Sequence, residues 1–310
     1  MTNWLLSRLR IVLVEPAGPL NLGSVARVMK NMGLSQLILV NPHCHPHDDD
    51  ARLMAVHAAD VLKSARIVAT LPEALVGCHR AVATTARDRD ILDAPLEHPR
   101  HILPWLIGQQ EVQAASSFTP QPIALESALI FGPEDRGLSN TELSYAQHCL
   151  RIPTSSLYPS LNLAQAVAIC CYELYQIAIF NWQNAIHEDA RESESGFPSS
   201  PLVPAEPAIS PQLIQHSAAK QITVSHDAEG GEPLENSSYP APLDDMEGFY
   251  QHLEATLLSI GYVFPHTADS RMKKFRRMFN RATLTTTEVS MLRGILRQVG
   301  WAMNHNKPDD

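Results

Sequence analysis

The first half of the chain predicts an α/β domain built on a parallel sheet, and the C-terminal part predicts a small, all-helical second domain. Short apolar runs rich in β-branched residues alternate with helical patterns through the first half. Several of these runs are apolar at consecutive positions, as expected for strands buried on both faces of a parallel sheet. Regular patterns return only after a long stretch rich in Pro, Ser, Gly and Glu, which is typical of a linker.

Six strands are expected, at Arg10–Glu15, Leu37–Asn41, Ile67–Leu71, Ala81–Thr85, Ala128–Phe131 and Cys149–Ile152. Helices fit between the earlier strands, at Leu22–Met32, Asp49–Lys63 and Pro72–Leu75. After the last strand, apolar residues from Leu163 to Ile177 recur at helical spacing and spread onto a second face. One face of this long helix should pack on the sheet, and the other is a candidate subunit interface.

These patterns divide the chain into a first domain over residues 1–183, a linker over 184–242 that we expect to be disordered, and a helical domain over 243–306. The helical domain has an apolar stripe from Phe249 to Ile260. A basic cluster follows it, with six basic residues and no acidic one between Arg271 and Arg281. The second domain is therefore expected to be locally basic.

The composition excludes several classes of protein. The 310-residue chain has a formal net charge of -9, which argues against binding nucleic acid through overall positive charge but allows a local basic patch. Its five cysteines form no C-x-x-C pair, so reduced structural thiols are expected. Arg8 and Arg10 interrupt the apolar start, and no apolar run reaches the ~20 residues of a membrane helix. We expect a cytoplasmic protein that has no membrane association.

Two common nucleotide-binding fingerprints are missing. The segment after the first strand has glycines only at Gly18 and Gly23, so the G-x-G-x-x-G motif is absent, as is the P-loop. Three other segments, Asn21–Leu34, Leu129–Leu143 and Ile152–Ile169, each read as a loop at the end of a strand. They combine Gly or Pro with Ser, Asn or Glu, so their backbones can approach a ligand closely.

In order and spacing, the three segments resemble the motifs of the SpoU/TrmH group of SPOUT methyltransferases. The motif N-x-G-x-x-x-R corresponds to Asn21, Gly23 and Arg27. The motif F-G-x-E-x-x-G-L corresponds to Phe131–Leu138, and S-L-N-x-(A/S)-x-A to Ser160–Ala166.

This resemblance implies transfer of a methyl group from S-adenosylmethionine to a ribose 2′-hydroxyl of RNA. It also implies a SPOUT-type sheet with a C-terminal trefoil knot, and a homodimer whose subunits share each active site. The segments "NPHCHPHDDDARLMAVHAADVL" and "ATTARDRD", and the C-terminal extension with "FRRMFNRA", resemble enzymes that methylate cytidine or uridine at nucleotide 32 of tRNA. The resemblance covers the chain except for the linker.

Two alternatives remain open from the sequence. The first is an enzyme of the same group that acts on ribosomal RNA, which the C-terminal extension disfavours because such relatives more often carry N-terminal additions. The second is a non-catalytic RNA-binding factor that keeps the fold. The intact motif residues Arg27, Glu134, Ser160 and Asn162 disfavour this second alternative.

The resemblance implies catalytic-site roles for Arg27, Asn21, Glu134, Ser160 and Asn162. A guanidinium is always charged, so we interpret Arg27 as gripping the phosphate beside the target ribose and stabilising the developing 2′-alkoxide. That phosphate, a water or the arginine itself can take the proton. A surface ion pair is the ordinary alternative for Arg27, and an exposed loop acid is the alternative for Glu134. Helix capping is the alternative for Asn21, Ser160 and Asn162. We assign Glu134 a supporting role that orients Asn162 or Arg27.

The resemblance also implies a cofactor site made largely of backbone, at Thr84, Thr85, Ala86, Gly132, Ile152, Pro159, Ser160 and Leu161. Such small and apolar residues suit recognition of an adenine edge by backbone amides. The chain departs from the family where Ala83 replaces the usual glycine and Pro159 replaces a serine. Because proline lacks an N–H, no hydrogen bond to the cofactor is expected from that amide.

Contacts to RNA are expected from Arg27, Arg87, Arg89, Lys273, Lys274, Arg276 and Arg277. The alternative for the last four is a solvated helix face opposite Phe275 and Phe279. Residues Pro42–Asp50 crowd His, Cys and Asp together, but their spacing matches no defined zinc site. We expect no metal, because methyl transfer from a sulfonium needs none.

Overall fold

The computed structural model describes residues 5–86, 96–108, 125–194 and 239–305. Six parallel strands form one sheet in the order β3-β2-β1-β5-β4-β6. The strands are β1 (Leu9–Val14), β2 (Gln36–Val40), β3 (Arg66–Val68), β4 (Arg80–Thr84), β5 (Ser127–Phe131) and β6 (His148–Leu150). All six predicted strands are confirmed, and each begins one residue before its predicted start. The trefoil knot stays a prediction.

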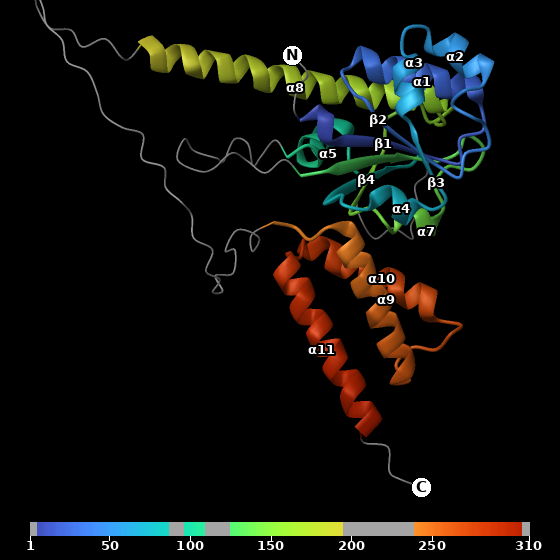
Figure 1. The fold of residues 1–310 in the computed structure, drawn as a ribbon, viewed down its shortest axis with the longest axis vertical. Helices are drawn as coiled ribbons and strands as arrows, with labels where there is room; N and C mark the ends of the chain where they lie inside the picture. The colour runs from blue at the N-terminus through green and yellow to red at the C-terminus, as the bar shows by residue number, and fades with distance from the viewer. Residues whose placement is uncertain (1–4, 87–95, 109–124, 195–238, 306–310) are drawn as a thin grey trace, which may run out of the picture.

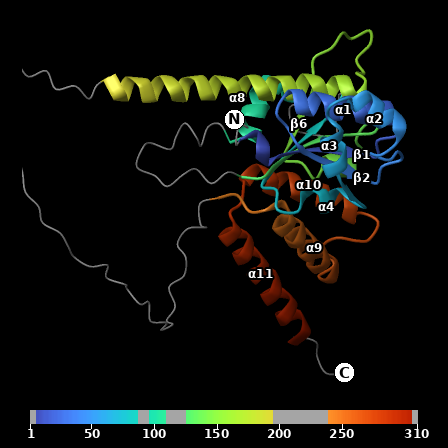
Figure 2. The ribbon, with the colours of Figure 1, turned by 45° about the horizontal axis from the view of Figure 1, so that its top comes forward.

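Helices cover both faces of the sheet (Figures 1 and 2). Among the described residues, the sheet domain has the 3-10 helix η1 (Leu6–Arg8) and seven α-helices: α1 (Pro19–Asn31), α2 (Asp49–Ala55), α3 (Ala59–Ser64), α4 (Leu71–Leu75), α5 (Pro99–Leu106), α7 (Asn140–Leu143) and α8 (Leu163–Glu194). The second domain begins with α9 (Leu243–Ser259) and α10 (Ala268–Ala282). Helix α11 (Thr286–His305) ends the described chain.

The strands are apolar at consecutive positions because each face of the sheet has its own core. Ile11 and Leu13 of β1 lie in a cluster with α1, α2, α3, α5 and α8. The intervening Val12 and Val14 lie in a second cluster with α4 and α7. This two-sided burial confirms the parallel α/β architecture expected from the sequence.

The structure divides one predicted helix in two. The expected helix Asp49–Lys63 is two helices, because Val56 adopts a positive φ of 52° and α3 begins only at Ala59. Both short helices bury alanine, valine or leucine in the same cluster, so the apolar spacing continues across the break. Helix α8 runs to Glu194, past the predicted end of the first domain at residue 183. The rest of the predicted linker, residues 195–238, lies outside the described residues.

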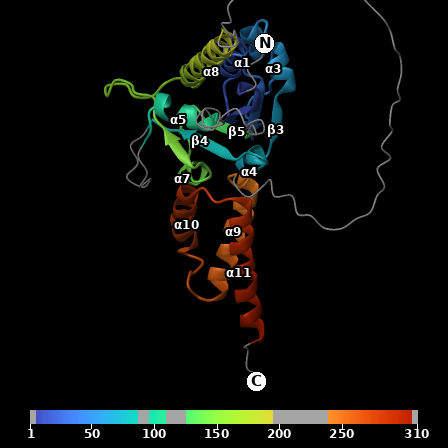
Figure 3. The same ribbon diagram turned by 90° about the vertical axis from the view of Figure 1, so that its left-hand side faces the viewer.

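The C-terminal domain is helical, as predicted, and lies below the sheet domain next to α4 and α7 (Figure 3). Its core contains Phe249, Tyr250 and Met272, with Phe279 packed against it. The rings of Phe249 and Phe279 meet edge to face at 5.0 Å, which is a favourable aromatic geometry. Within the described ranges, none of the helices combines the length and hydrophobicity that crossing a lipid bilayer would require.

Candidate active site

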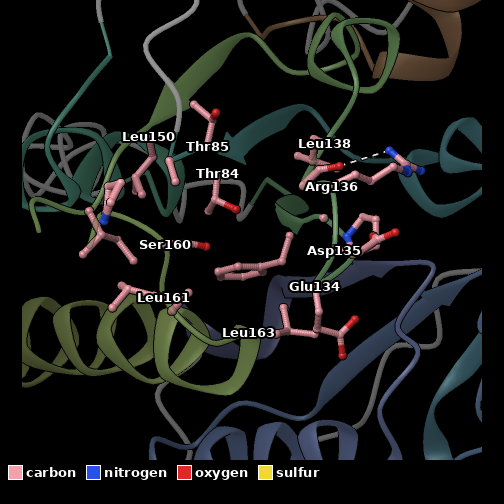
Figure 4. Close-up of a pocket in the computed structure, with 18 residues that line it drawn as sticks. Thr84, Thr85, Glu134, Asp135, Arg136, Leu138, Leu150, Ser160, Leu161 and Leu163 are labelled. Atoms are coloured by element: carbon pink, nitrogen blue, oxygen red, sulfur yellow. Dashed lines mark hydrogen bonds between the residues drawn. The ribbon is translucent and has the colours of Figure 1, made fainter. Parts of the chain in front are cut away.

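One pocket lies at the carboxyl ends of β4, β5 and β6, where the loops of two motif segments meet (Figure 4). All eight residues predicted to hold the cofactor line it: Thr84, Thr85, Ala86, Gly132, Ile152, Pro159, Ser160 and Leu161. Apolar side chains such as Phe131 and Leu150 complete the wall. Ligands of parallel α/β proteins bind at this edge of the sheet, because the loops that follow the strands converge there.

Hydrogen bonds between neighbouring strand ends fix the shape of this pocket. The Thr84 hydroxyl donates to the Ile130 carbonyl at 3.0 Å. The Thr85 amide donates to the Leu150 carbonyl, also at 3.0 Å. On the β5 loop, a Cβ added at Gly132 would lie 2.3 Å from the Leu138 amide nitrogen. The glycine therefore lets this loop fold tightly onto itself along the pocket wall.

A chain of hydrogen bonds joins one residue from each of the three motif segments. Glu134 accepts from the Asn21 side-chain amide at 2.9 Å. The Asn21 carbonyl oxygen in turn accepts from the Asn162 side-chain amide at 2.9 Å. Asn162 also caps α8, because its side-chain oxygen accepts from the Ala164 amide at 2.9 Å. The Asn162 side chain therefore caps α8 and contacts Asn21 at the same time. Its expected link to Glu134 exists and runs through Asn21.

Glu134 is held as a carboxylate by this arrangement. Its two oxygens also accept from the backbone amides of Ala17 and Gly18, each at 3.2 Å. Burial alone would raise the pKa of Glu134, but hydrogen bonds from Asn21 and from backbone amides outweigh it and lower the pKa below its usual value. In Figure 4 the carboxylate of Glu134 points away from Thr84 and Ser160, which agrees with its contacts to the start of α1.

The lowered pKa gives a test of Glu134. Because the folded-state pKa lies below the ordinary value of 4.5, the ionised carboxylate stabilises the protein at neutral pH. That stabilisation is lost as pH falls through the folded-state pKa. Glu134→Gln should therefore be less stable than the wild type at pH 7, and the difference should shrink below pH 4.5. Urea unfolding of both proteins from pH 7 to pH 3.5 measures it, and a pH-independent difference would contradict it.

An ion-pair network also supports the pocket, and sequence reasoning missed it. Arg136, on the pocket wall, donates to Glu15 at 2.7 Å and to both oxygens of Glu142 at 2.9 and 3.0 Å. These bonds, first to Glu142 and then to Glu15, raise the pKa of Arg136. Ser139 and Glu142 also form a capping box on α7. The S-x-x-E spacing of that box was the available signal for Glu142.

Arg27 lies on α1, six residues beyond Asn21 and about 9 Å further along the helix axis. It is exposed, and among the described residues no hydrogen bond or ion pair to its guanidinium is found. The surface ion pair that was the ordinary alternative is therefore not formed within that part of the chain. Ser24, one turn before it, donates to the Leu20 carbonyl at 2.8 Å. Arg27 thus belongs to the same motif as Asn21 but does not line the pocket.

The predicted basic residues of the C-terminal domain are not brought to this pocket, because none of them lines it. Lys274 on α10 is exposed, and Lys273 pairs with Asp269 at 2.6 Å. Arg276 does not face outward as expected, since it pairs with Glu247 and both side chains are largely buried. Arg87 and Arg89 lie outside the described residues.

The histidine-rich loop at residues 42–50 carries its own contacts. The Asp48 carboxylate accepts from the His45 amide at 2.8 Å, and the rings of His45 and His47 lie 5.1 Å apart. Among the described residues, no group of three or more His, Cys, Asp or Glu side chains is placed to hold a metal ion.

Comparison with known proteins identifies the family. The model of the SpoU rRNA Methylase family matches residues 8–172, and that of the tRNA methyltransferase TrmJ C-terminal domain matches residues 244–308. The tRNA (cytidine/uridine/adenosine-2′-O-)-methyltransferase TrmJ of Pseudomonas aeruginosa is 34% identical over 99% of this chain and 100% of its own length. The chain belongs to the TrmJ group of the SpoU methylase family.

Other members of the TrmJ group agree with this assignment. The tRNA (cytidine/uridine-2′-O-)-methyltransferase TrmJ of Pectobacterium atrosepticum is 38% identical over 95% of this chain and 98% of its own length. The crystal structure of TrmJ from Z. mobilis ZM4 is 25% identical and aligns over 94% of this chain and 98% of its own, with a TM-score of 0.65. The family resemblance seen in the sequence is confirmed across both domains.

Proposed function

We propose that this protein transfers a methyl group from S-adenosylmethionine to a ribose 2′-hydroxyl of tRNA. The observation that carries the proposal is the Glu134–Asn21–Asn162 chain of hydrogen bonds, which joins all three family motifs beside one pocket. Membership in the TrmJ group supports tRNA as the substrate and disfavours both ribosomal RNA and a non-catalytic role.

The pocket fits S-adenosylmethionine by its chemistry. Apolar side chains and backbone groups at the strand ends suit an adenosine. When bound, the cofactor supplies a methyl group on a positively charged sulfur. Thr84, Thr85, Ala86, Gly132, Ile152, Pro159, Ser160 and Leu161 would hold it.

The residues of this chain position the RNA beside the cofactor and stabilise the charge that develops on the ribose 2′-oxygen. Arg27 binds the phosphate next to the target ribose and stabilises the 2′-oxygen as it loses its proton. The Asn21 and Asn162 amides and the Glu134 carboxylate hold the start of α1 against the start of α8, so the motif that carries Arg27 keeps its place beside the pocket. Ser160, exposed on the pocket wall, lies where it can contact the ribose or the cofactor. Orientation of the reactants accounts for much of the rate.

We further propose nucleotide 32 of the anticodon loop as the target, with cytidine or uridine as the base.

We also propose that the active form is a homodimer. Leu20 on α1 is 51% exposed, and Ile169 and Tyr172 on α8 are 37% and 49% exposed. The two helices pack side by side. Exposed apolar side chains gathered on adjacent helices favour a partner surface, which a second copy of the chain would cover.

Methyl transfer to unmodified tRNA transcripts, followed by mapping of the labelled nucleotide, tests the proposal. Label on a 2′-hydroxyl in the anticodon loop is expected. Label on ribosomal RNA and on no tRNA would overturn the substrate. Absence of transfer to either RNA, without thermal stabilisation by S-adenosylhomocysteine, would overturn the enzymatic role.

A further inference from the structure

Arg276 on α10 is directed at the boundary between the two domains. Its guanidinium donates to the two oxygens of Glu247 on α9 at 2.6 and 2.9 Å. The same guanidinium lies over two tyrosine rings, 4.5 Å from the centroid of Tyr250 and 5.2 Å from that of Tyr145. Tyr145 belongs to the sheet domain, directly after α7, so one buried cation joins the two domains.

Further polar contacts fix the same boundary. The Leu243 amide donates to the Cys78 carbonyl at 2.7 Å, and the Gly77 amide donates to the Asp244 carboxylate at 2.9 Å. These bonds tie the start of α9 to the turn before β4. Leu243 is also buried in the sheet-domain cluster that contains α4 and α7. The domains therefore meet through directional contacts and shared apolar burial, and these define one orientation.

The boundary is continuous with the back of the candidate active site. Arg136 on the pocket wall is bonded to Glu142 of α7, and Tyr145 follows α7 within one turn. Helix α7 and the residues just after it therefore contact both the pocket wall, through Arg136, and α10, through Tyr145. In Figure 3, α10 lies immediately below α7.

We propose that the Arg276–Tyr145 contact is a positioning device that orients the C-terminal domain, so that the exposed basic residues of α10 meet tRNA bound at the active site. This inference rests on the proposed tRNA methylation. Arg276 then acts through the orientation of its neighbours, such as the exposed Lys274, and does not itself touch a phosphate. Because it is paired and largely buried, it has no free face for RNA.

Two substitutions from opposite sides of the boundary separate positioning from direct RNA contact. Arg276→Met removes the cation, and Tyr145→Ala removes a ring that carries no charge. Both are expected to raise the KM for tRNA about tenfold, as loss of a desolvated cation–π contact implies. The KM for S-adenosylmethionine should stay within about twofold of the wild-type value. Tyr145→Phe keeps the aromatic face and should restore the wild-type KM for tRNA.

Arg52→Met is the matched control, because it removes an exposed arginine from α2 on the far side of the sheet domain. It should leave both KM values unchanged. In the double variant, the two effects on the KM for tRNA should not multiply, because they break the same contact.

Two results would overturn the proposal. An increase with Arg276→Met but none with Tyr145→Ala would mean that Arg276 contacts RNA directly. Wild-type KM values for both variants would mean that the contact does not position the domain. Thermal unfolding and S-adenosylhomocysteine binding show that each variant is folded. If the wild-type protein itself fails to methylate tRNA, the proposed function fails, and that result is distinct from a defect confined to the variants.

Discussion

Arg27→Ala is expected to lower the rate of methyl transfer by about 10²- to 10³-fold, as loss of one group that stabilises a developing oxyanion does. Arg27 is exposed and carries no ion pair or hydrogen bond within the described part of the chain. Its loss should therefore cost no measurable stability, and thermal unfolding should match the wild type. S-adenosylhomocysteine affinity should also be unchanged, since Arg27 does not line the pocket.

Arg27→Lys separates charge from geometry. Lysine keeps the positive charge but cannot form the bidentate, planar pair with phosphate that a guanidinium forms. We expect it to recover part of the lost rate. A tRNA with a neutral methylphosphonate at the phosphate beside the target ribose should slow the wild type strongly and the Arg27→Ala variant little further. A full additional loss in the variant would contradict the phosphate grip and favour the arginine itself as the base.

The sequence was most informative where one local rule sets the structure. Buried parallel strands need apolar residues on both faces, so the strands were found within one residue at their start. The eight residues predicted to hold the cofactor all line one pocket, because the loops that follow β4, β5 and β6 converge at the same sheet edge. Motif spacing also placed Asn21, Glu134 and Asn162, although it could not say that Asn21 stands between the other two.

Features that depend on distant partners were not predictable. Glu15 and Arg136 are far apart in the chain, and nothing local in either segment indicates their 2.7 Å ion pair. Helical spacing placed Arg276 on the outer face, opposite Phe275. The inward position of Arg276 depends on Glu247 and on Tyr145 of the other domain. The break at Val56 was hidden because both flanking helices bury their apolar residues in one cluster.

Gly132→Ala is expected to weaken S-adenosylhomocysteine binding by between about ten- and a hundredfold, with about 1–3 kcal/mol lost from the free energy of unfolding. An added Cβ would lie 2.3 Å from the Leu138 nitrogen and 2.5 Å from the Gly137 carbonyl carbon. Both are backbone atoms, so no side chain can rotate away to make room. The loop from Gly132 to Leu138 must open, and it forms one wall of the pocket.

Gly300→Ala is the matched control for this substitution. A Cβ at Gly300 meets no atom within 4 Å, and the residue lies within α11, so alanine should be neutral or slightly stabilising there. Isothermal titration with S-adenosylhomocysteine and urea unfolding compare the two variants. Loss of stability in Gly132→Ala without loss of affinity would mean that the crowded loop is structural and does not shape the binding site. Loss of affinity in a folded Gly132→Ala protein, with the Gly300→Ala variant unchanged, would show that cofactor binding requires the Gly132 backbone to pack closely against Gly137 and Leu138.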